Sequence, residues 1–414
     1  MTYTPDLGRI KADVEALARM TRDSAGPGER AAAAWAAERL AQAGVVEVTI
    51  EPYRGRATNS WSFAAHSVAG LAALRLGGLR GAVLALCAAV SLERDASGRP
   101  PWRRQVLGGG TGANAVGRIR ARGAARATVV VVAHIDAAKT GLAWHPALAR
   151  AGVARRLRTR RADPVMAPQA AGLVAAAAAA VAPSGSRTRR ALTVGAVIVN
   201  AAAVALNLDI ARSPTVPGAN DDATGVAVAL ELARALAADP LDHVDVVIAL
   251  VGSEESGMGG FHALLEARAG ALRPATTLVV GIDTLGCGTP IVASSEGAIL
   301  EHRYRDADLA LADEGAALAG EPAPQRWRIG AWTDPLLALT RGIPAICVLS
   351  IGPDGAYTHY HVPSDLPEHV DWDSVGACAR ITHGVLRAVE RRYQPMVPAP
   401  PLNGPTRSVV IQPP

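Results

Sequence analysis

Histidine and acidic side chains recur at a few points along this sequence, and each point follows an apolar run or a tight loop. The groups are His134 with Asp136, Asp221 with Asp222, Glu254 with Glu255, the single Asp283, and His361. Carboxylates that gather in one place repel each other, and burial raises the cost of their charge unless cations neutralise them. Imidazole and carboxylate groups are also ligands of divalent metals. These residue types therefore predict a site for two divalent ions.

The runs that precede these groups predict strands of a parallel sheet. Residues 129–133, 246–251 and 278–282 are continuous apolar stretches, which are typical of strands buried on both faces. In open α/β sheets, ligands bind beyond the carboxyl ends of such strands. We therefore expect an α/β fold with a mixed, mostly parallel central sheet, helices on both faces, and the candidate ligands at one edge.

Helical periodicity, capping residues and apolar runs predict the remaining elements. The expected helices are 7–21, 29–43, 224–238, 260–271, 307–318, 334–340 and 372–392, and the expected strands are 45–50, 113–119, 127–132, 244–251, 277–282 and 345–349. No strand of the catalytic domain is predicted between residues 50 and 113, which indicates an insertion there.

Two apolar segments divide the expected catalytic domain. The domain should comprise residues 1–60, 106–142 and 214–393, with apolar insertions at 61–92 and 166–210 and a proline-rich, disordered tail at 394–414. We expect each insertion to be a helical hairpin, because His134 and Asp221 flank the second one and must still meet in one site.

The insertions also predict contact with a membrane. Only 191–208 approaches the roughly 20 apolar residues that a bilayer span needs. The arginine-rich segment 155–161 would keep the catalytic domain on the cytoplasmic side by the positive-inside rule. The alternative is a soluble cytoplasmic protein in which an alanine-rich helical layer or lid lies over the site.

Composition limits the other function classes. With 414 residues, half of them apolar, the chain can bury a large core. The net charge of +5 comes almost entirely from arginine, and aromatic residues make up only 4%, too few for a base-stacking surface. We therefore expect no nucleic-acid partner. The four cysteines are too widely spaced for a CxxC zinc site and too few for a disulfide scaffold, so we expect buried free thiols.

Local spacing suggests a role for several of these residues. In the segment His134-Ile135-Asp136 the two polar side chains share one face of an extended chain, so the carboxylate can fix the imidazole tautomer. Adjacent Glu254 and Glu255 point in different directions, which lets one bind metal while the other takes a proton. Alone, Asp221 could equally be a helix cap, and spacing does not select between His359 and His361.

Taken together, the groups resemble the aminopeptidase S and aminopeptidase Y family of co-catalytic zinc peptidases, whose relatives include glutamate carboxypeptidase II and glutaminyl cyclases. The resemblance covers residues 7–56, 106–142 and 214–392. It implies a zinc exopeptidase-like fold and two zinc ions as cofactors. Five ligand positions matching in order are a strong signal, although each motif alone is weak.

The resemblance also implies a role for each residue. His134 and Asp283 would bind one zinc, Glu255 and His361 the other, and Asp221 would bridge both. The catalytic residues would be Glu254 as general base, Asp136, which orients His134, and Tyr360, which stabilises the oxyanion. Asp365 would provide structural support.

These roles predict an aminopeptidase that hydrolyses peptides with a free N-terminus through a water activated by two zinc ions. One alternative is an acyl transferase of the glutaminyl-cyclase kind with a single zinc. Another is a non-catalytic membrane receptor or scaffold on the same fold. Where many relatives have Ser-Asp-His, this chain has Thr333-Asp334-Pro335, so we infer no side-chain preference for the substrate.

Overall fold

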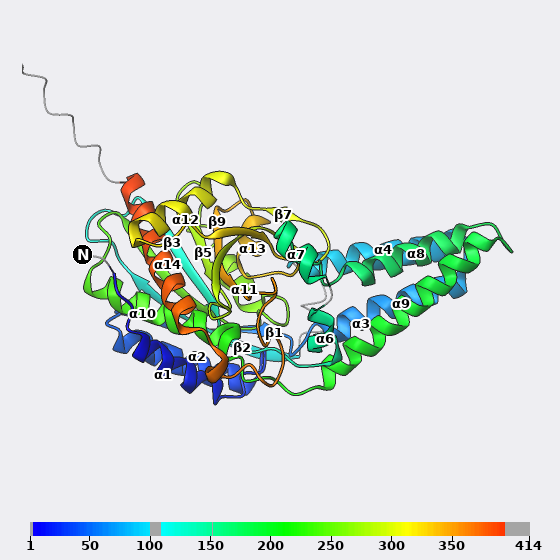
Figure 1. The fold of residues 1–414 in the computed structure, drawn as a ribbon, viewed down its shortest axis with the longest axis horizontal. Helices are drawn as coiled ribbons and strands as arrows, with labels where there is room; N and C mark the ends of the chain where they lie inside the picture. Colours follow the sequence, from blue (N-terminus) through cyan, green and yellow to red (C-terminus); the bar gives the residue numbers. More distant parts are fainter. Residues whose placement is uncertain (1–2, 100–108, 151, 394–414) are drawn as a thin grey trace, which may run out of the picture.

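One mixed β-sheet forms the centre of the computed structural model, which describes residues 3–99, 109–150 and 152–393 (Figure 1). Its strands are β1 (Glu47–Gly55), β2 (Gly110–Ile119), β3 (Ala127–His134), β4 (Val244–Val251), β5 (Thr277–Ile282), β6 (Thr289–Glu296), β7 (His302–Arg303), β8 (Gln325–Arg328) and β9 (Ala345–Ile351). They follow the order β1-β2-β4-β3-β5-β9-β6-β7, with β8 paired to β6. The central strands β4, β3, β5 and β9 are parallel, and antiparallel pairs flank them.

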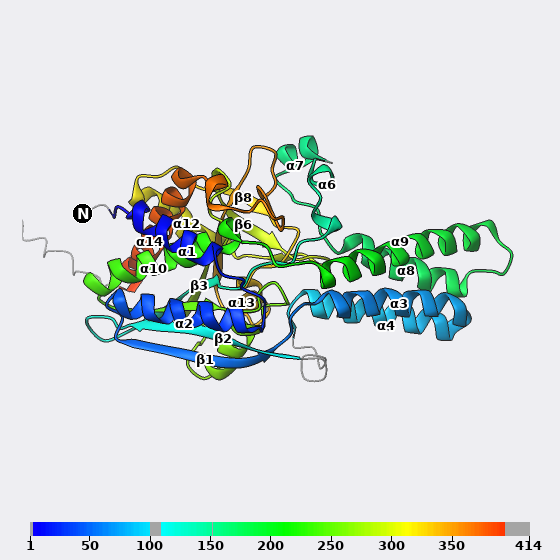
Figure 2. The same cartoon turned by 90° about the horizontal axis from the view of Figure 1, so that it is seen from below.

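Helices cover both faces of this sheet (Figures 1 and 2). One face carries α1 (Leu7–Ala18), α2 (Pro27–Gln42), α10 (Thr224–Ala238), α12 (Asp306–Ala319) and α14 (Trp372–Tyr393), and the other carries α11 (Gly259–Ala267) and α13 (Pro335–Leu339). Two short helices, α6 (Pro146–Ala149) and α7 (Val153–Thr159), follow β3. Every residue of β4 and β5 is buried, as expected for strands covered on both sides. The predicted α/β class with a mixed sheet is confirmed.

Several element boundaries differ from the prediction. The first strand is Glu47–Gly55, not 45–50, and the helix expected at 260–271 already ends at Ala267. Strands β6, β7 and β8 were not predicted at all, because they are short or lack long apolar runs. The sequence of β6, for example, is TPIVASSE. The expected disordered tail, 394–414, lies outside the described residues.

Four helices form a bundle that extends from one end of the body (Figures 1 and 2). They are α3 (Ser60–Leu76), α4 (Gly78–Ala96), α8 (Ala167–Val181) and α9 (Arg187–Arg212). The turn between α3 and α4 uses Gly77 and Gly78, whose φ angles of 61° and 55° favour glycine. The chain thus leaves and re-enters the body at the same end of the bundle, on both hairpins.

The bundle packs through small side chains. Its buried cluster consists of Ala73, Ala82, Ala85, Ala176, Ala177, Ala180 and Ala196. A Cβ atom added to Gly70 would lie 2.7 Å from Leu173 Cδ2 and 2.9 Å from Asn200 Oδ1, so α3 approaches both α8 and α9 closely. Helices therefore approach one another at glycine and alanine positions.

Large apolar side chains point outward from the same helices. Of the nineteen large apolar side chains that are exposed in the described part of the chain, twelve belong to the bundle. They are Trp61, Val68, Leu76, Leu79, Val83, Leu86, Val90, Val174, Val181, Val194, Val197 and Ile198. Within the described residues, α9 is the one helix long and apolar enough to cross a membrane. A helical bundle in water buries its large apolar side chains and exposes polar ones, whereas this bundle buries small side chains and exposes large apolar ones.

Candidate metal centre

The sheet brings the predicted ligands together at the carboxyl edge of its parallel strands. His134 is the last residue of β3 and pairs in register with Val251 at the end of β4. Glu254 and Glu255 follow that strand after a short turn, and Asp283 directly follows β5. Parallel neighbours that end at the same level necessarily present their next residues to the same space.

Two further ligand candidates come from loops. Asp221 lies in the irregular turn Ala219–Ala223 that leads into α10, and His361 lies in the loop after β9. The alternative histidine, His359, is exposed, its Nδ1 lies 2.8 Å from Ser364 Oγ, and its ring stacks on His369. Of the two histidines, His361 is therefore the one that reaches the site.

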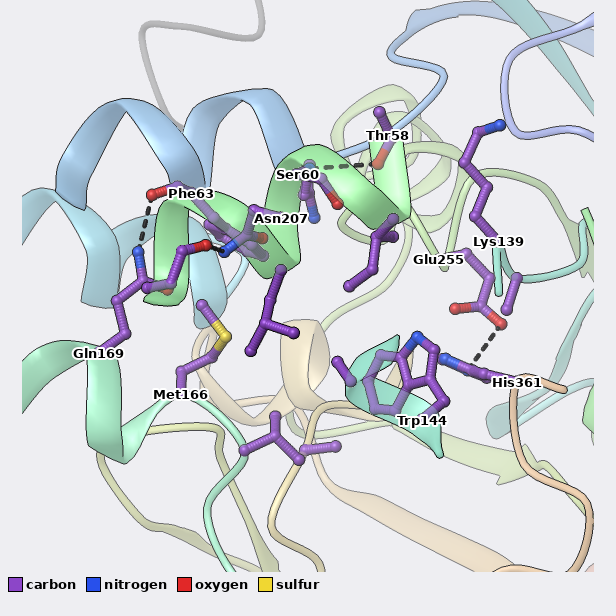
Figure 3. A pocket seen from close by; sticks show the side chains of 18 of the residues that line it. Thr58, Ser60, Phe63, Lys139, Trp144, Met166, Gln169, Asn207, Glu255 and His361 are labelled. Atoms are coloured by element: carbon purple, nitrogen blue, oxygen red, sulfur yellow. Dashed lines mark hydrogen bonds and ion pairs between the residues drawn. The ribbon is translucent and has the colours of Figure 1, made fainter. Parts of the chain in front are cut away.

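Asp221 lies between two histidines. Its Oδ1 is 3.1 Å from His134 Nε2, and its Oδ2 is 3.1 Å from His361 Nε2. Glu255 Oε1 is 3.3 Å from the same His361 nitrogen, a contact drawn in Figure 3. One carboxylate thus contacts a nitrogen ligand on each side, which is the geometry that a bridging ligand requires.

The donor atoms fit divalent cations. Ligand atoms of His134, Asp221 and Glu255 all lie within 4.8 Å of one another, and so do those of His134, Asp222 and Asp283. Asp221 Oδ2, Glu254 Oε1, Glu255 Oε1 and His361 Nε2 are buried and make no aligned hydrogen bond with any described residue, although the histidine nitrogen is within ion-pair distance of two of the oxygens. Buried polar atoms without partners are costly. Nitrogen and carboxylate donors in this number suit zinc.

Three other aspartates hold the backbone that carries these ligands. Asp222 is close enough to be a ligand itself, but both of its oxygens are already occupied. Its Oδ1 accepts hydrogen bonds from the N–H groups of Gly225 and Thr284, and its Oδ2 accepts one from the N–H of His134. It thereby connects the ends of β3 and β5 to the start of α10. We interpret Asp222 as a support for the site and not as a ligand.

Asp136 and Asp365 act in the same way on the two ligand turns. Asp136 accepts hydrogen bonds from the N–H groups of Glu254 and Glu255 at 3.0 and 3.3 Å. Asp365 accepts from the N–H groups of Asn220 and Asp221. Asp136 also lies 3.5 Å from His134 Nδ1 through its carboxylate, and its backbone carbonyl oxygen is nearer, at 3.1 Å. The contacts of Asp136 therefore reach a histidine and both glutamates.

The pKa shifts of the site residues indicate that buried carboxylates outnumber the positive charges near them. Burial raises the pKa of Glu254 and of Glu255, and it raises the pKa of Asp283 to about 6. For His361, burial acts to lower the pKa, but Glu255 and Asp221 outweigh it and raise the pKa to about 10. The histidines act in the opposite sense on Asp221 and hold its pKa below the usual range despite burial. The raised pKa values mean that protons are held by these groups, and a bound cation could replace those protons.

Two tyrosines face the same space. The ring of Tyr360 stacks on His361 with centroids 3.8 Å apart. Tyr357, which the sequence did not single out, has a buried hydroxyl without a hydrogen bond to any described residue, and both tyrosines line the small cavity formed by His134, Asp221 and Asp283. The sequence did not identify Tyr357 as a site residue, because the conformation of the loop decides whether its ring lies beside that of Tyr360.

Comparison with known proteins agrees with this geometry. Residues 200–386 match the model of Peptidase family M28. That range includes Asp221, Glu254, Glu255, Asp283 and His361, whereas His134 precedes it. A probable zinc metalloprotease of Leptosphaeria maculans is 44% identical over 81 residues, which cover 20% of this chain and 17% of that protein. The predicted family resemblance is confirmed.

Solved structures support the same fold. BSAP, a zinc aminopeptidase from Bacillus subtilis, aligns with a TM-score of 0.55 at 13% identity, over 93% of this chain and 95% of that one. The glutaminyl cyclase of Bacteroides thetaiotaomicron aligns with a TM-score of 0.54 at 13% identity, over 93% and 98% of the two chains. At such identities the likeness concerns the fold alone.

Removing the metal should destabilise the protein. A ligand that binds only the folded state at 100 times its Kd stabilises it by about 2.7 kcal/mol. We expect dialysis against a strong chelator to lower the thermal unfolding midpoint by several degrees, and added zinc to restore it. The Asp221→Ala variant is the control, since chelation should leave its midpoint unchanged. An identical midpoint before and after chelation of the unsubstituted protein would contradict the assignment.

Replacing Asp222 should weaken the fold without removing a ligand. The Asp222→Asn variant keeps the shape of the side chain but replaces one acceptor oxygen by an amide that cannot accept, so at least one of the three backbone N–H groups loses its partner. We expect a loss of about 1 to 3 kcal/mol in unfolding free energy, measured by urea titration. Asp6→Asn, at the exposed N-terminus of α1, should cost much less; equal losses in both variants would refute the special role of Asp222.

Proposed function

We propose that this protein is a zinc-dependent exopeptidase, specifically an aminopeptidase, that removes N-terminal residues from peptides. The observation that carries the proposal is the position of Asp221, 3.1 Å from a nitrogen of each of two histidines. In the proposed centre His134 and Asp283 would hold one zinc, Glu255 and His361 would hold the other, and Asp221 would contact both. The family match and the zinc metalloprotease relative support the zinc-peptidase part of the proposal.

Bound zinc ions would supply Lewis acidity, which lowers the pKa of the attacking water and polarises the scissile carbonyl. Glu254 is the proposed general base. Its Oε1 is buried without a hydrogen bond, and burial raises the pKa of its carboxyl group. A raised pKa suits a group that must first take a proton from water and then release it to the departing amine. Asp136 fixes this glutamate through its backbone N–H.

Other residues would bind and orient the substrate. The hydroxyl of Tyr360 is the proposed donor to the oxyanion, and the buried hydroxyl of Tyr357 is a second donor in the same cavity. The negative charge of Glu254 and Glu255 would attract the protonated N-terminus of a peptide. A charged amine recognised in this way explains why the site would act on chain ends.

We also infer that the bundle inserts into a membrane. Small residues lie between its helices and large apolar residues face outward, which is the pattern of helices packed in lipid. The uncharged stretch 191–208 of α9 is about 27 Å long, close to the roughly 30 Å of a hydrocarbon core. Arginines 187, 189 and 190 precede this stretch, and Arg212 follows it. We place the catalytic body on the cytoplasmic side on the strength of the five arginines in 155–161, against which Arg187, Arg189 and Arg190 at the far turn act by the same rule.

Replacing the general base should abolish hydrolysis and leave the metal in place. General-base catalysis contributes about 10² to 10⁴ in rate, so we expect Glu254→Gln to lower kcat for leucine p-nitroanilide by at least a hundredfold. Elemental analysis should still find two zinc ions per chain; one ion would favour the glutaminyl-cyclase alternative. Glu266→Gln, at an exposed position of α11, should retain full activity. Unchanged turnover in Glu254→Gln would remove this residue from its proposed role.

Membrane insertion should depend on the outward apolar residues. We expect the protein to stay with membranes after carbonate washing. An arginine near the midplane costs about 2.5 to 3.5 kcal/mol, so the Val174→Arg, Val197→Arg double variant, with both changes at exposed positions near the middle of α8 and α9, should move to the soluble fraction. Val46→Arg, at a fully exposed position of the body, should remain membrane-bound. Recovery of the unsubstituted protein in the soluble fraction would reject insertion.

A further inference from the structure

One cavity of about 500 Å³ connects the candidate metal centre with the helical bundle. Glu254, Glu255, Tyr360 and His361 line one end of it. Figure 3 shows Glu255, His361 and Lys139 at that end, while Phe63, Met166 and Gln169 lie at the opposite end, among the bundle helices. The space is therefore continuous from the reacting groups to the insertion.

Helix α9 forms the long wall of this cavity. Its lining residues follow one stripe of the helix and are Ile198, Val199, Ala202, Ala203, Leu206, Asn207 and Ile210. From Ile198 to Ile210 the helix rises about 18 Å. An extended peptide covers that distance with about five residues at 3.3 to 3.6 Å each. The cavity is thus a groove long enough for a segment of chain, and not only for one side chain.

Away from the metal centre the groove is mostly apolar and carries no charged side chain among its described lining residues, and its polar lining residues there include Asn59, Ser60, Gln169 and Asn207. Phe63, Trp144, Met166 and Trp332 form the facing walls. The ionisable residues of the lining are Lys139, Glu254, Glu255 and His361, all near the metal centre, and Lys139 donates from Nζ to the carbonyl oxygen of Ser213 at 2.9 Å. A charged side chain in the bundle half would lose its hydration and find no oppositely charged partner in that lining.

We propose that this groove binds an apolar segment of the peptide substrate, about five residues long, on the C-terminal side of the scissile bond. The inference rests on the proposed aminopeptidase function. Only one residue precedes the bond that an aminopeptidase cleaves, so a groove of several residues must hold the part that follows it. The substrates are therefore peptides that begin with a run of apolar residues.

The position of the groove also gives the direction from which such peptides arrive. Ile198, at the far end, is exposed on the outer face of α9 as well as lining the groove. The groove thus opens beside the apolar surface of the bundle. Apolar peptides that gather at that surface would reach the metal centre along α9, past a wall on which Asn207 is the polar side chain.

Two peptides with the same first residues test the selectivity in detergent solution. Both hexapeptides begin with Leu-Ala and end in a C-terminal amide, and positions three to six are Val-Leu-Val-Leu in one and Ser-Asn-Ser-Asn in the other, so that neither carries a charge within the groove. We expect kcat/KM to be at least tenfold higher for the apolar peptide. Equal kcat/KM values for the two, in an enzyme that also cleaves the dipeptide Leu-Ala, would overturn the groove proposal and leave the peptidase intact.

A bulky side chain in the groove tests the location. Ala203→Trp, with Ala202→Phe as a second and smaller plug, should lower kcat/KM for the apolar hexapeptide at least tenfold and leave that for Leu-Ala within twofold. Ala205→Trp is the matched control, because Ala205 is exposed on α9 and does not line the groove. Equal effects of Ala203→Trp and Ala205→Trp would contradict the location.

A binding measurement separates the groove from the catalytic proposal. The apolar hexapeptide should bind zinc-loaded Glu254→Gln by calorimetry, and adding Ala203→Trp should weaken the Kd at least tenfold. Binding with this pattern, but no hydrolysis by the unsubstituted enzyme, would reject the peptidase and keep the groove. Hydrolysis of Leu-Ala with no difference in Kd between these variants would do the opposite.

Discussion

Carboxylate charge is buried at the carboxyl edge of the sheet, and its compensation organises the structure around it. The aspartates there fall into two groups. Asp136, Asp222 and Asp365 accept hydrogen bonds from backbone N–H groups, which favour the charged form of a carboxyl group, yet burial still raises the pKa of Asp222, and it raises the pKa of Asp365 to about 7. Asp221, by contrast, lies between two histidines that hold its pKa low. Glu254, Glu255 and Asp283 share its cavity, and burial raises the pKa of all three, so the cluster as a whole favours a bound cation.

The same division explains the rigidity of the site. Each supporting aspartate connects two parts of the chain that are distant in sequence: Asp136 joins β3 to the turn after β4, and Asp365 joins the loop after β9 to the turn before α10. Arg22, fully buried, donates to the carbonyl oxygens of Ile135 and Gly218 and adds the N-terminal segment to this network. Ligands placed by such connections keep their positions when the metal leaves, since no single loop can relax alone.

The sequence predicted those parts of the fold that depend on local pattern. The central strands were visible because β3, β4 and β5 are nearly continuous apolar runs, and their common edge predicted where acidic and histidine groups gather. The ligand set itself, with His361 and not His359, came from the family resemblance. The supporting role of Asp222 was not visible, since an aspartate before a helix reads as an ordinary cap until its contacts with His134 and Thr284 are known. Strand β6 was missed for a related reason. Its pairing with β9 is set by tertiary contacts, and a strand that contains Pro290 and two serines has a weak local signal.

Helix α9 links the two halves of the molecule. Small residues such as Ala196 pack it against the other helices, Val194 and Val197 face outward, and Ala203 and Leu206 line the groove to the metal centre. A helix in a water-soluble bundle needs only one apolar stripe, whereas α9 is apolar on nearly its whole circumference from 191 to 208. If the bundle inserts into a membrane and the groove holds an apolar substrate, as we propose, then the other helices, the lipid and the substrate would account for all of its faces. Without lipid, the stripe that carries Val194 and Val197 would be exposed to water.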